Sequence, residues 1–306
     1  MPRCATKMSI NYTTHLVEAE SLWRKYIPCE TIFDLWEVRM AFHRHFCRPL
    51  RFLYLSDDSA DKLFLPLSWV EEKNVWCFFP GETWHTKTWL EQNRLLPSHL
   101  DTEILRRELG ADFQLRYLSK PCHTSADYPI DETGYLFHPP DYQYQIQNWW
   151  NSFSHRRARL LRRELAAVEE KGVIIRYGEE ELFNLMVQMN TERFAADSFF
   201  ADSRFREGFR GMIETLSQLG LLRVTSVYCG GQLAAIDFGA VFKERYTLLA
   251  GGTDARFPGV AKLINLHHMQ WACDERLDEV DFLCGDFCWK PLFHLKPRPL
   301  YLFSSL

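Results

Sequence analysis

Both halves of this 306-residue chain show the same order of predicted elements, and this order limits the possible folds more than any other feature of the sequence. In each half, segments with the three- and four-residue apolar spacing of helices come first. Three strand-like runs separated by polar turns follow, and then one helix and one further strand. We therefore expect an α/β protein with two copies of one fold, each a mixed, mostly antiparallel sheet flanked by helices. Sequence identity between the halves is not visible, so the repeat is inferred from element order alone.

The first half has helical spacing from Leu16 to Tyr26 and again over residues 32–46. Its three strand-like runs are RFLYLS, KLFLPLSWV and NVWCFFPG, and a helix that stops at Gly110 leads to the strand FQLRYLS. Residues 121–142 lack periodicity and are rich in proline, which is typical of a connection. We place the domain boundary in this segment and expect lobes at residues 1–135 and 136–306.

The second half repeats the order more clearly. Helices are predicted over residues 144–171, 179–194, 203–219 and 258–274. VIIRYG is a strand after the first helix, and the runs LLRVTSVYC and QLAAIDFGAVF are joined by Gly230-Gly231, a signal for a tight hairpin. ERYTLLAGG is the next strand, EVDFLCG follows the last helix, and LYLF near the end of the chain is a candidate final strand.

Composition excludes several classes of protein. Lys+Arg 36 against Asp+Glu 40 give a net charge of −4, so no global positive field points to nucleic acid. No uncharged apolar run approaches the ~18–20 residues that span a bilayer, and the N-terminus lacks a signal-peptide core, so we expect a cytoplasmic protein. The nine cysteines are scattered and are interpreted as reduced thiols. The adjacent His267 and His268 point about 100° apart on a helix, so they do not share a metal.

The segment TLLAGGTDARFPGVAK carries the strongest functional signal, because a strand passes through a glycine-containing loop into a helix. Pro258 suits a first helical turn, where a missing N–H costs nothing. The N–H groups of Gly259, Val260 and Ala261 would then point outward from a helix end of partial positive charge, which is a natural pyrophosphate site. Glycine at 259 would permit close approach of the phosphate. The alternative is a tight turn that only caps the helix.

The run Arg256-Phe257-Pro258-Gly259-Val260-Ala261 resembles the Arg/Gln-x-x-Gly-x-Gly/Ala pattern of GNAT acyltransferases, in the strand-to-helix position that this family uses. In that family the loop holds the pyrophosphate of coenzyme A. The resemblance implies acetyl-CoA or another acyl-CoA as the donor, and no metal. The donor-binding residues that it implies are Leu249, Ala250 and Gly251 on the strand, with Arg256, Gly259, Val260, Ala261 and Lys262 on the loop and helix.

Residues 144–303 resemble one branch of that superfamily, the acetyltransferases associated with cellulose and exopolysaccharide biosynthesis and the related Fem-type peptidyltransferases. Three features carry the resemblance: the basic helix HRRARLLRRELAAVEEKGV, the RFPGVAK loop, and the ending VDFLCGDFCWKPLF. The ending matches the branch's Asp-Phe…Gly-x-x-x-Tyr/Trp-Lys pattern through Asp281, Phe282, Gly285, Trp289 and Lys290. Fem-type proteins hold two GNAT-like lobes in tandem, the first of them degenerate. Because the first-half loop PGETWHTK lacks the pattern, we expect residues 1–135 to form a degenerate lobe that does not bind coenzyme A.

Four side chains are candidates for catalysis: Asp237, Tyr246, Asp286 and Lys290. Asp237 lies in an otherwise apolar strand and would act as general base on an attacking amine if it lines the cleft. The Tyr246 hydroxyl would act as general acid toward the departing thiolate, although core packing is the commoner outcome for such a residue. Asp286 and Lys290 follow the strand EVDFLCG, where they would orient the acceptor or contact its phosphate. The alternative for these two is an intrachain ion pair of little energetic value.

These patterns favour an acyltransferase that moves an acyl group from acyl-CoA to an amine or hydroxyl of a sugar or peptidyl acceptor. Two alternatives stay open. A Fem-like transferase would take its group from aminoacyl-tRNA and use the basic helix HRRARLLRRELAAVEEKGV as a phosphate-binding surface. A non-catalytic tandem GNAT scaffold would instead bind a partner protein through exposed aromatic side chains.

Overall fold

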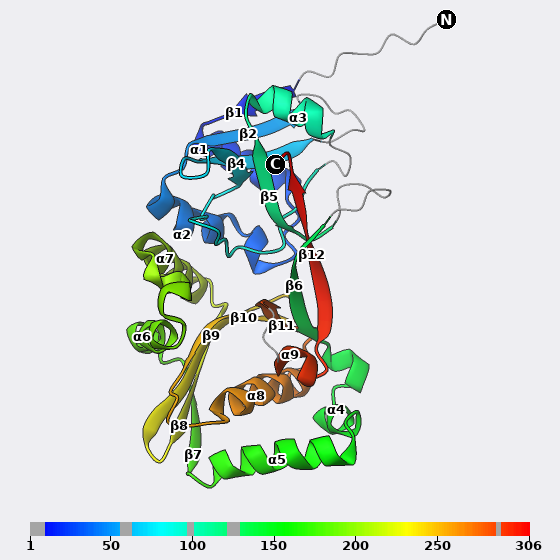
Figure 1. Cartoon of the computed structure of the whole chain (residues 1–306), viewed down its shortest axis with the longest axis vertical. Helices are drawn as coiled ribbons and strands as arrows, with labels where there is room; N and C mark the ends of the chain where they lie inside the picture. Colours follow the sequence, from blue (N-terminus) through cyan, green and yellow to red (C-terminus); the bar gives the residue numbers. More distant parts are fainter. Residues whose placement is uncertain (1–9, 56–62, 97–100, 121–128, 286–288) are drawn as a thin grey trace, which may run out of the picture. The chain divides into compact units, whose positions relative to one another are not determined.

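The computed structural model describes residues 10–55, 63–96, 101–120, 129–285 and 289–306. The chain divides into two compact units (Figure 1). The first consists of Met1–Glu132 with Pro299–Leu306, and the second of Thr133–Arg298. The prediction of a degenerate lobe at residues 1–135 and an acyltransferase lobe at residues 136–306 stays a prediction. None of the helices in the described ranges is long and apolar enough to cross a membrane.

The first unit contains a sheet of strand order β1-β2-β3-β4-β5-β12. Its strands are β1 (Ile10–Thr13), β2 (Leu50–Leu55), β3 (Phe64–Val70), β4 (Val75–Phe78), β5 (Phe113–Leu118) and β12 (Lys296–Ser304). Its helices are α1 (Leu16–Tyr26), α2 (Trp36–Phe46) and α3 (Thr102–Leu109), with the 3-10 turn η1 (Ile32–Asp34). All neighbouring strands run antiparallel except β4 and β5, which are parallel. An aromatic core fills the unit, in which Trp23 and Trp36 pack on Phe64 and Phe79.

The second unit contains the strand order β6-β11-β10-β9-β8-β7. Its strands are β6 (Ile130–Phe137), β7 (Val173–Tyr177), β8 (Leu222–Cys229), β9 (Gln232–Phe242), β10 (Arg245–Thr253) and β11 (Glu279–Cys284). Its α-helices are α4 (Ile146–Asn151), α5 (His155–Glu169), α6 (Phe183–Phe194), α7 (Ser203–Gln218), α8 (Val260–Asp274) and α9 (Trp289–Leu292). Its 3-10 turns are η2 (Pro139–Tyr142), η3 (Glu180–Leu182), η4 (Ala195–Asp197) and η5 (Phe199–Ala201). Here too every pair is antiparallel except one, β10 with β11.

The two units share one connectivity, which confirms the expected fold class. Each has a first strand, two helices, a three-stranded antiparallel meander, a further helix, and a strand parallel to the last strand of the meander. The sixth strands differ in origin. The first unit is completed by β12 from the end of the chain, whereas β6 follows β5 in sequence and pairs with β11 of the second unit.

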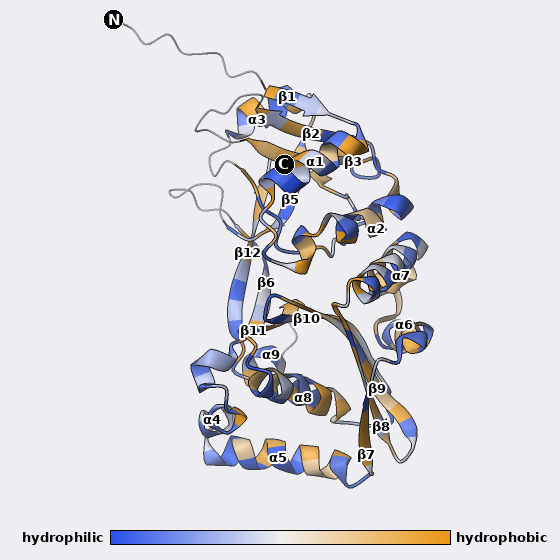
Figure 2. Cartoon of the chain, turned by 180° about the vertical axis from the view of Figure 1, so that it is seen from behind, coloured by the Kyte–Doolittle hydropathy of each residue, from blue (hydrophilic) through white to orange (hydrophobic). Residues whose placement is uncertain are grey.

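Side chains alternate between the two faces of the second sheet, and a different set of helices covers each face (Figure 1). On one face, Phe238 of β9 packs on Phe183 of α6, and α7 lies on the same side. On the other face, Ala235 of β9 belongs to a core with Leu161 of α5 and Ile264 of α8. Figure 2 shows both hydrophobic and hydrophilic residues along α5, as expected of a helix with one buried face.

The structure corrects two details of the sequence prediction. The single helix expected over residues 144–171 is two helices, because the Ser152 hydroxyl donates to the Trp149 carbonyl and the Ser154 side chain caps α5 by accepting from the Arg157 N–H. The connection expected over residues 121–142 contains β6, whose first half is mostly polar and only partly buried. Its pairing with β11 is non-local, so local sequence gives little sign of it.

Candidate functional site

The parallel strands β10 and β11 stay together for only a short distance. Their register covers Arg245–Thr247 against Glu279–Asp281. Beyond these pairs, β10 continues to Thr253 and β11 to Cys284, while the other edge of β11 pairs with β6 from Val280 to Cys284. The carboxyl ends of two parallel strands therefore separate, and such ends are where α/β proteins usually bind ligands. We take this point of separation as the candidate site.

A bulge in β10 begins where the strands separate. The register of β10 against β9 shifts between Leu248 and Ala250, so Leu249 is an additional residue in the ladder. A bulge bends its strand and leaves backbone groups outside the regular ladder, and bulges are frequent beside active sites. Leu249, Ala250 and Gly251, three of the predicted donor-binding residues, thus lie at and just after an irregular part of the strand.

Two successive glycines follow the bulge, and each permits a different close contact. A Cβ at Gly251 would lie 2.0 Å from Asp237 Oδ1 on the neighbouring strand. A Cβ at Gly252 would lie 2.7 Å from Met189 Cβ and 2.9 Å from the Met186 carbonyl oxygen of α6. The glycine pair is therefore required by packing on both faces of β10, a reason that the sequence pattern did not reveal.

The loop after β10 leads into α8 as the sequence predicts, but with a different helix start. Gly259 is the N-cap with φ +92°, and α8 begins at Val260. The Val260 N–H donates to the Phe257 carbonyl within the loop, so it does not point outward as expected. A Cβ at Gly259 would also approach Val168 Cγ2 of α5 to 3.0 Å. Glycine is thus needed here for its left-handed backbone and for the contact with α5.

Both cationic side chains of the predicted donor site have carboxylate partners. The Arg256 guanidinium donates to both oxygens of Asp254, and these hydrogen bonds lower the pKa of that carboxyl below its usual value. Lys262 forms an ion pair with Glu164 of α5. A third cation, Lys171, lies 5.4 Å from the centre of the Phe257 ring. Sequence reasoning missed Lys171, because it follows α5 and is distant from the loop in sequence.

Asp237 and Tyr246 both lie inside the second unit. Asp237 Oδ2 is 3.0 Å from His268 Nε2 of α8, and both side chains are buried. The Tyr246 ring packs over Gly239, where a Cβ would lie 2.4 Å from the hydroxyl oxygen. Its centroid is 4.9 Å from that of His268. Burial raises the pKa of Tyr246 well above its usual value, and the charge of Asp237 raises it further.

Lys290 is buried on α9 and holds the end of β11. Its Nζ donates to the carbonyl oxygens of Phe282 at 3.0 Å and of Leu283 and Cys284 at 2.9 Å. The three ammonium donors are therefore directed at backbone rather than toward an acceptor. Asp286, the remaining predicted catalytic residue, lies outside the described residues.

Asp281 of β11 occupies a buried ion pair. Its carboxylate accepts from Arg298 Nη1 at 2.7 Å and from the Leu283 N–H at 2.9 Å. This arrangement gives Asp281 a structural role within the second unit. Within the described residues, no group of three or more His, Cys, Asp or Glu side chains is placed to hold a metal ion.

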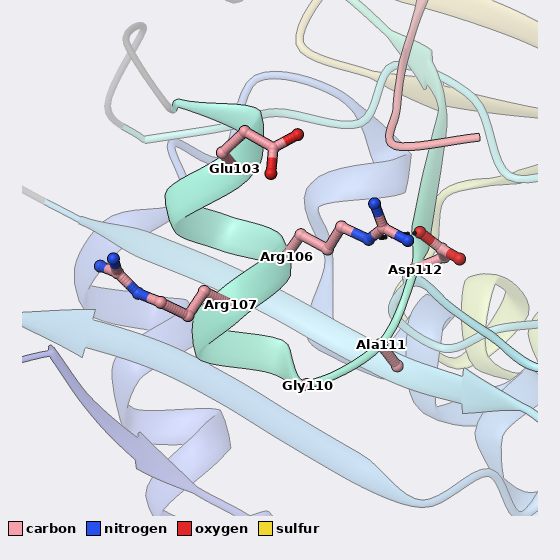
Figure 3. A pocket seen from close by; sticks show the side chains of 6 residues that line it. All are labelled: Glu103, Arg106, Arg107, Gly110, Ala111 and Asp112. Carbon is pink, nitrogen blue, oxygen red and sulfur yellow. Dashed lines mark ion pairs between the residues drawn. The ribbon is translucent and has the colours of Figure 1, made fainter.

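The corresponding segment of the first unit is built differently. After β4 the chain turns through Gly81, and the buried Glu82 carboxylate accepts from the Trp89 and Leu90 N–H groups at 3.2 and 2.9 Å. The carboxylate of Glu82, which belongs to this segment, thus takes up the hydrogen bonds of two backbone N–H groups. A surface hollow in this unit lies at the end of α3 instead (Figure 3). Its lining residues are Glu103, Arg106, Arg107, Gly110, Ala111 and Asp112, and they include none of the predicted site residues.

Comparison with known families agrees with this arrangement of strand, bulge, loop and helix. Residues 154–291 match the family model described as an acetyltransferase (GNAT) domain. The chain contains a GNAT domain. The matched segment includes β10, the loop to α8, β11 and Lys290, so the candidate site belongs to this domain. No curated protein sequence matches the chain.

Solved structures resemble the whole chain in fold at low sequence identity. A conserved protein of unknown function from Bacteroides thetaiotaomicron VPI-5482 is 10% identical, with a TM-score of 0.58 over 97% of this chain and 99% of that one. FemX is 10% identical, with a TM-score of 0.56 over 97% of both chains. L-PGS from Bacillus licheniformis is 11% identical, with a TM-score of 0.51 over 95% of this chain and 91% of that one. Each of these likenesses concerns the fold alone. Each covers both the unit that contains the GNAT domain and the unit that precedes it.

Proposed function

We propose that this chain is an acyltransferase that takes an acyl group from acyl-CoA and transfers it to an amine or hydroxyl of a sugar or peptidyl acceptor. One observation carries the proposal: β10 separates from β11 at a bulge and then runs, through a short loop, into α8. An extended pantetheine arm can lie along a strand whose backbone groups are not used by a neighbour. The partial positive charge at the start of α8 suits the pyrophosphate at the other end of that arm.

The chemistry requires little beyond positioning and charge stabilisation. The acceptor nitrogen or oxygen attacks the thioester carbonyl, an oxyanion forms, and coenzyme A leaves as a thiolate. Backbone N–H groups near the bulge at Leu249 would stabilise the oxyanion. Holding donor and acceptor together supplies much of the remaining acceleration. Lys290 would act by fixing the shape of β11, since its ammonium is bonded to that strand's carbonyls.

The experiment is thermal unfolding with and without acetyl-CoA, coenzyme A and a longer acyl-CoA. A ligand at 100-fold its dissociation constant adds about 2.7 kcal/mol to the free energy of unfolding. Ala261→Glu places a negative charge in the first turn of α8 and should abolish the shift, whereas Ala261→Gln, of the same size but neutral, should keep most of it. This pair is preferable to Gly259→Glu, which would strain the backbone and clash with Val168 whatever the loop binds. Absence of a shift with every donor would refute the proposal.

A second candidate function is transfer from aminoacyl-tRNA. It is favoured by the solvent-facing arginines of α5, Arg156, Arg159 and Arg163, and by the fold likeness to FemX. For this function, tRNA would bind with an affinity that falls steeply with salt. Replacing two of these arginines with glutamate should weaken tRNA binding and leave the acyl-CoA shift unchanged. Binding of tRNA without any response to acyl-CoA would favour the second function over the first.

A further inference from the structure

The cations that the sequence pattern places at the donor loop, residues 254–259, are already balanced by carboxylates. Arg256 donates to both oxygens of Asp254, and Lys262 pairs with Glu164 of α5. The hydrogen bonds from Arg256 lower the pKa of Asp254, so this carboxylate stays charged near pH 7. A phosphate that approached Arg256 would therefore meet a negative charge beside the positive one. The loop offers backbone N–H groups to an anionic ligand but little net positive charge.

A further cation reaches the start of the donor loop from α6. Arg193 is an exposed residue in the last turn of α6, and its Nη1 lies 2.8 Å from the hydroxyl oxygen of Thr253, the last residue of β10. A basic side chain at a helix end often bonds the last carbonyl groups of its own helix. Arg193 bonds the strand instead, and among the described residues no carboxylate lies within ion-pair distance of it.

The alternation of side chains along β10 shows where this guanidinium lies. A Cβ at Gly252 would meet Met186 and Met189, so residue 252 faces α6. The side chain of Thr253 points to the opposite face, which α8 covers. Arg193 starts on α6 and ends at the Thr253 hydroxyl, so its side chain passes β10. The guanidinium is thus brought to the carboxyl end of β10, where the donor loop begins.

Hydrogen bonds fix this end of α6 to β10. Asn190 lies three residues before the arginine and therefore on the same side of the helix. Its Nδ2 donates to the Gly251 carbonyl at 3.0 Å, and its Oδ1 accepts from the Ser198 hydroxyl at 2.8 Å. The Ser198 hydroxyl accepts in turn from the Phe200 N–H at 3.2 Å. The backbone that carries Arg193 is therefore held in place before a ligand binds, which lowers the entropy cost of binding.

A second such cation approaches the donor loop from the other face of the sheet. Lys171 follows α5, and its Nζ lies 5.4 Å from the centre of the Phe257 ring, in the middle of the loop. Lys171 is exposed, and within the described ranges it has no carboxylate at ion-pair distance either. Because α5 and α6 lie on opposite faces of the sheet (Figure 1), the loop has one cation without a carboxylate partner on each side.

We propose that Arg193 and Lys171 bind the phosphate groups of the acyl-CoA donor and supply the positive charge that Arg256, balanced by Asp254, does not. The proposal rests on the acyltransferase function proposed above and deepens it. The planar guanidinium can donate two parallel hydrogen bonds to one phosphate, whereas the ammonium of Lys171 acts as a point charge. Coenzyme A carries a pyrophosphate and a 3′-phosphate, and either group has the chemistry that these side chains recognise.

The test measures the dissociation constants of coenzyme A, dephospho-coenzyme A and pantetheine by isothermal titration calorimetry, at about 0.1 M salt. Arg193→Gln and Lys171→Gln should each weaken the binding of coenzyme A by about tenfold or more. The double variant should weaken it by roughly the product of the two losses, because the two side chains share no partner. Pantetheine has no phosphate, so its affinity should be the same for wild type and all variants.

Dephospho-coenzyme A identifies which phosphate each cation binds, because it keeps the pyrophosphate and lacks the 3′-phosphate. Equal losses for this ligand and for coenzyme A assign the altered side chain to the pyrophosphate. A loss for coenzyme A alone assigns it to the 3′-phosphate. Both results support the proposal, whereas a variant that loses pantetheine binding to the same extent has a disturbed site, and this outcome overturns the role of that side chain.

Two matched controls address the loop and the total charge. Asp254→Asn combined with Arg256→Gln removes a balanced ion pair and should change the affinity for coenzyme A by less than about threefold. Arg176→Gln removes another exposed arginine that lies over an aromatic ring, on the edge strand β7, and should leave the affinity unchanged.

The outcomes separate this inference from the proposed function. A wild-type chain that binds neither coenzyme A nor dephospho-coenzyme A overturns the acyltransferase function and this inference with it. A chain that binds coenzyme A with wild-type affinity in both Arg193→Gln and Lys171→Gln overturns this inference alone. A loss in one of these variants removes the other residue from the proposal. Losses as large in Arg176→Gln would reveal a general effect of net charge and would also overturn it.

Discussion

Lys290→Met is the substitution whose outcome most directly separates a tethering lysine from one that binds substrate. The side chain of Lys290 is buried, at 2% exposure, and its Nζ bonds three consecutive carbonyls at the end of β11. Two residues of that segment have positive φ, Leu283 at +56° and Gly285 at +103°, so the segment is not a regular strand that would hold its shape alone.

The magnitude follows from the number of bonds and from the burial of the charge. A hydrogen bond to a charged group contributes about 1.5–3 kcal/mol. In the variant, the carbonyl groups that lose this donor also carry the desolvation cost of an unsatisfied buried acceptor. Against this, Met avoids the cost of burying an ammonium, which is several kcal/mol. We expect a net loss of about 2–4 kcal/mol in the free energy of unfolding. For a unit of this size that is a fall in Tm of roughly 5–15 °C.

The assay is thermal unfolding followed by circular dichroism, with donor binding measured on the same samples. Lys296→Met is the matched control, because Lys296 is exposed and pairs only at the surface with Asp141, so its loss should change stability by less than about 1 kcal/mol. A Lys290→Met protein that unfolds at the same Tm as wild type but has lost acyl transfer would refute the tethering argument. It would instead restore the contact with the acceptor that the sequence predicts.

Two further predictions concern stability. Gly252→Ala should cost about 1–3 kcal/mol, because the new Cβ meets the backbone of α6 at Met186 and has no flexible atom to displace; an unchanged urea midpoint would contradict this. Glu279→Gln should raise stability at pH 7 but not at pH 4. Burial, then the charge of Asp281, raises the folded pKa of Glu279, so the stability present at low pH is lost as the pH rises from the unfolded pKa through the folded one. Equal effects of this substitution at both pH values would show that Glu279 is not the group responsible.

The sequence predicts the local parts of this fold well. Helical spacing, strand-like runs and turn residues identify the order of elements, including the strand, loop and helix around Pro258. Each of these signals lies within a few residues of the feature that it predicts. The C-terminal run LYLF is also a strand, as part of β12.

What the sequence leaves out depends on contacts between distant segments. His268 follows another histidine, and helical spacing excludes a shared metal, but nothing nearby indicates a carboxylate 31 positions earlier. The partners of Lys290 are backbone atoms, which leave no mark in the residue pattern. The glycines at 251 and 252 are visible as flexible positions, yet the atoms that need the space belong to β9 and α6.

The strand that completes the first unit, β12, follows the second unit in sequence, and this affects how the protein folds while it is being made. Residues 299–306 belong to the first unit, and β12 pairs with β5 through Tyr301, Phe303 and Ser304. A nascent chain therefore cannot complete its first unit until residues 299–306 leave the ribosome, and until then one side of β5 is an open edge, prone to pairing with other chains. A chain cut off just before residue 299 would therefore be damaged in its first unit rather than in its second.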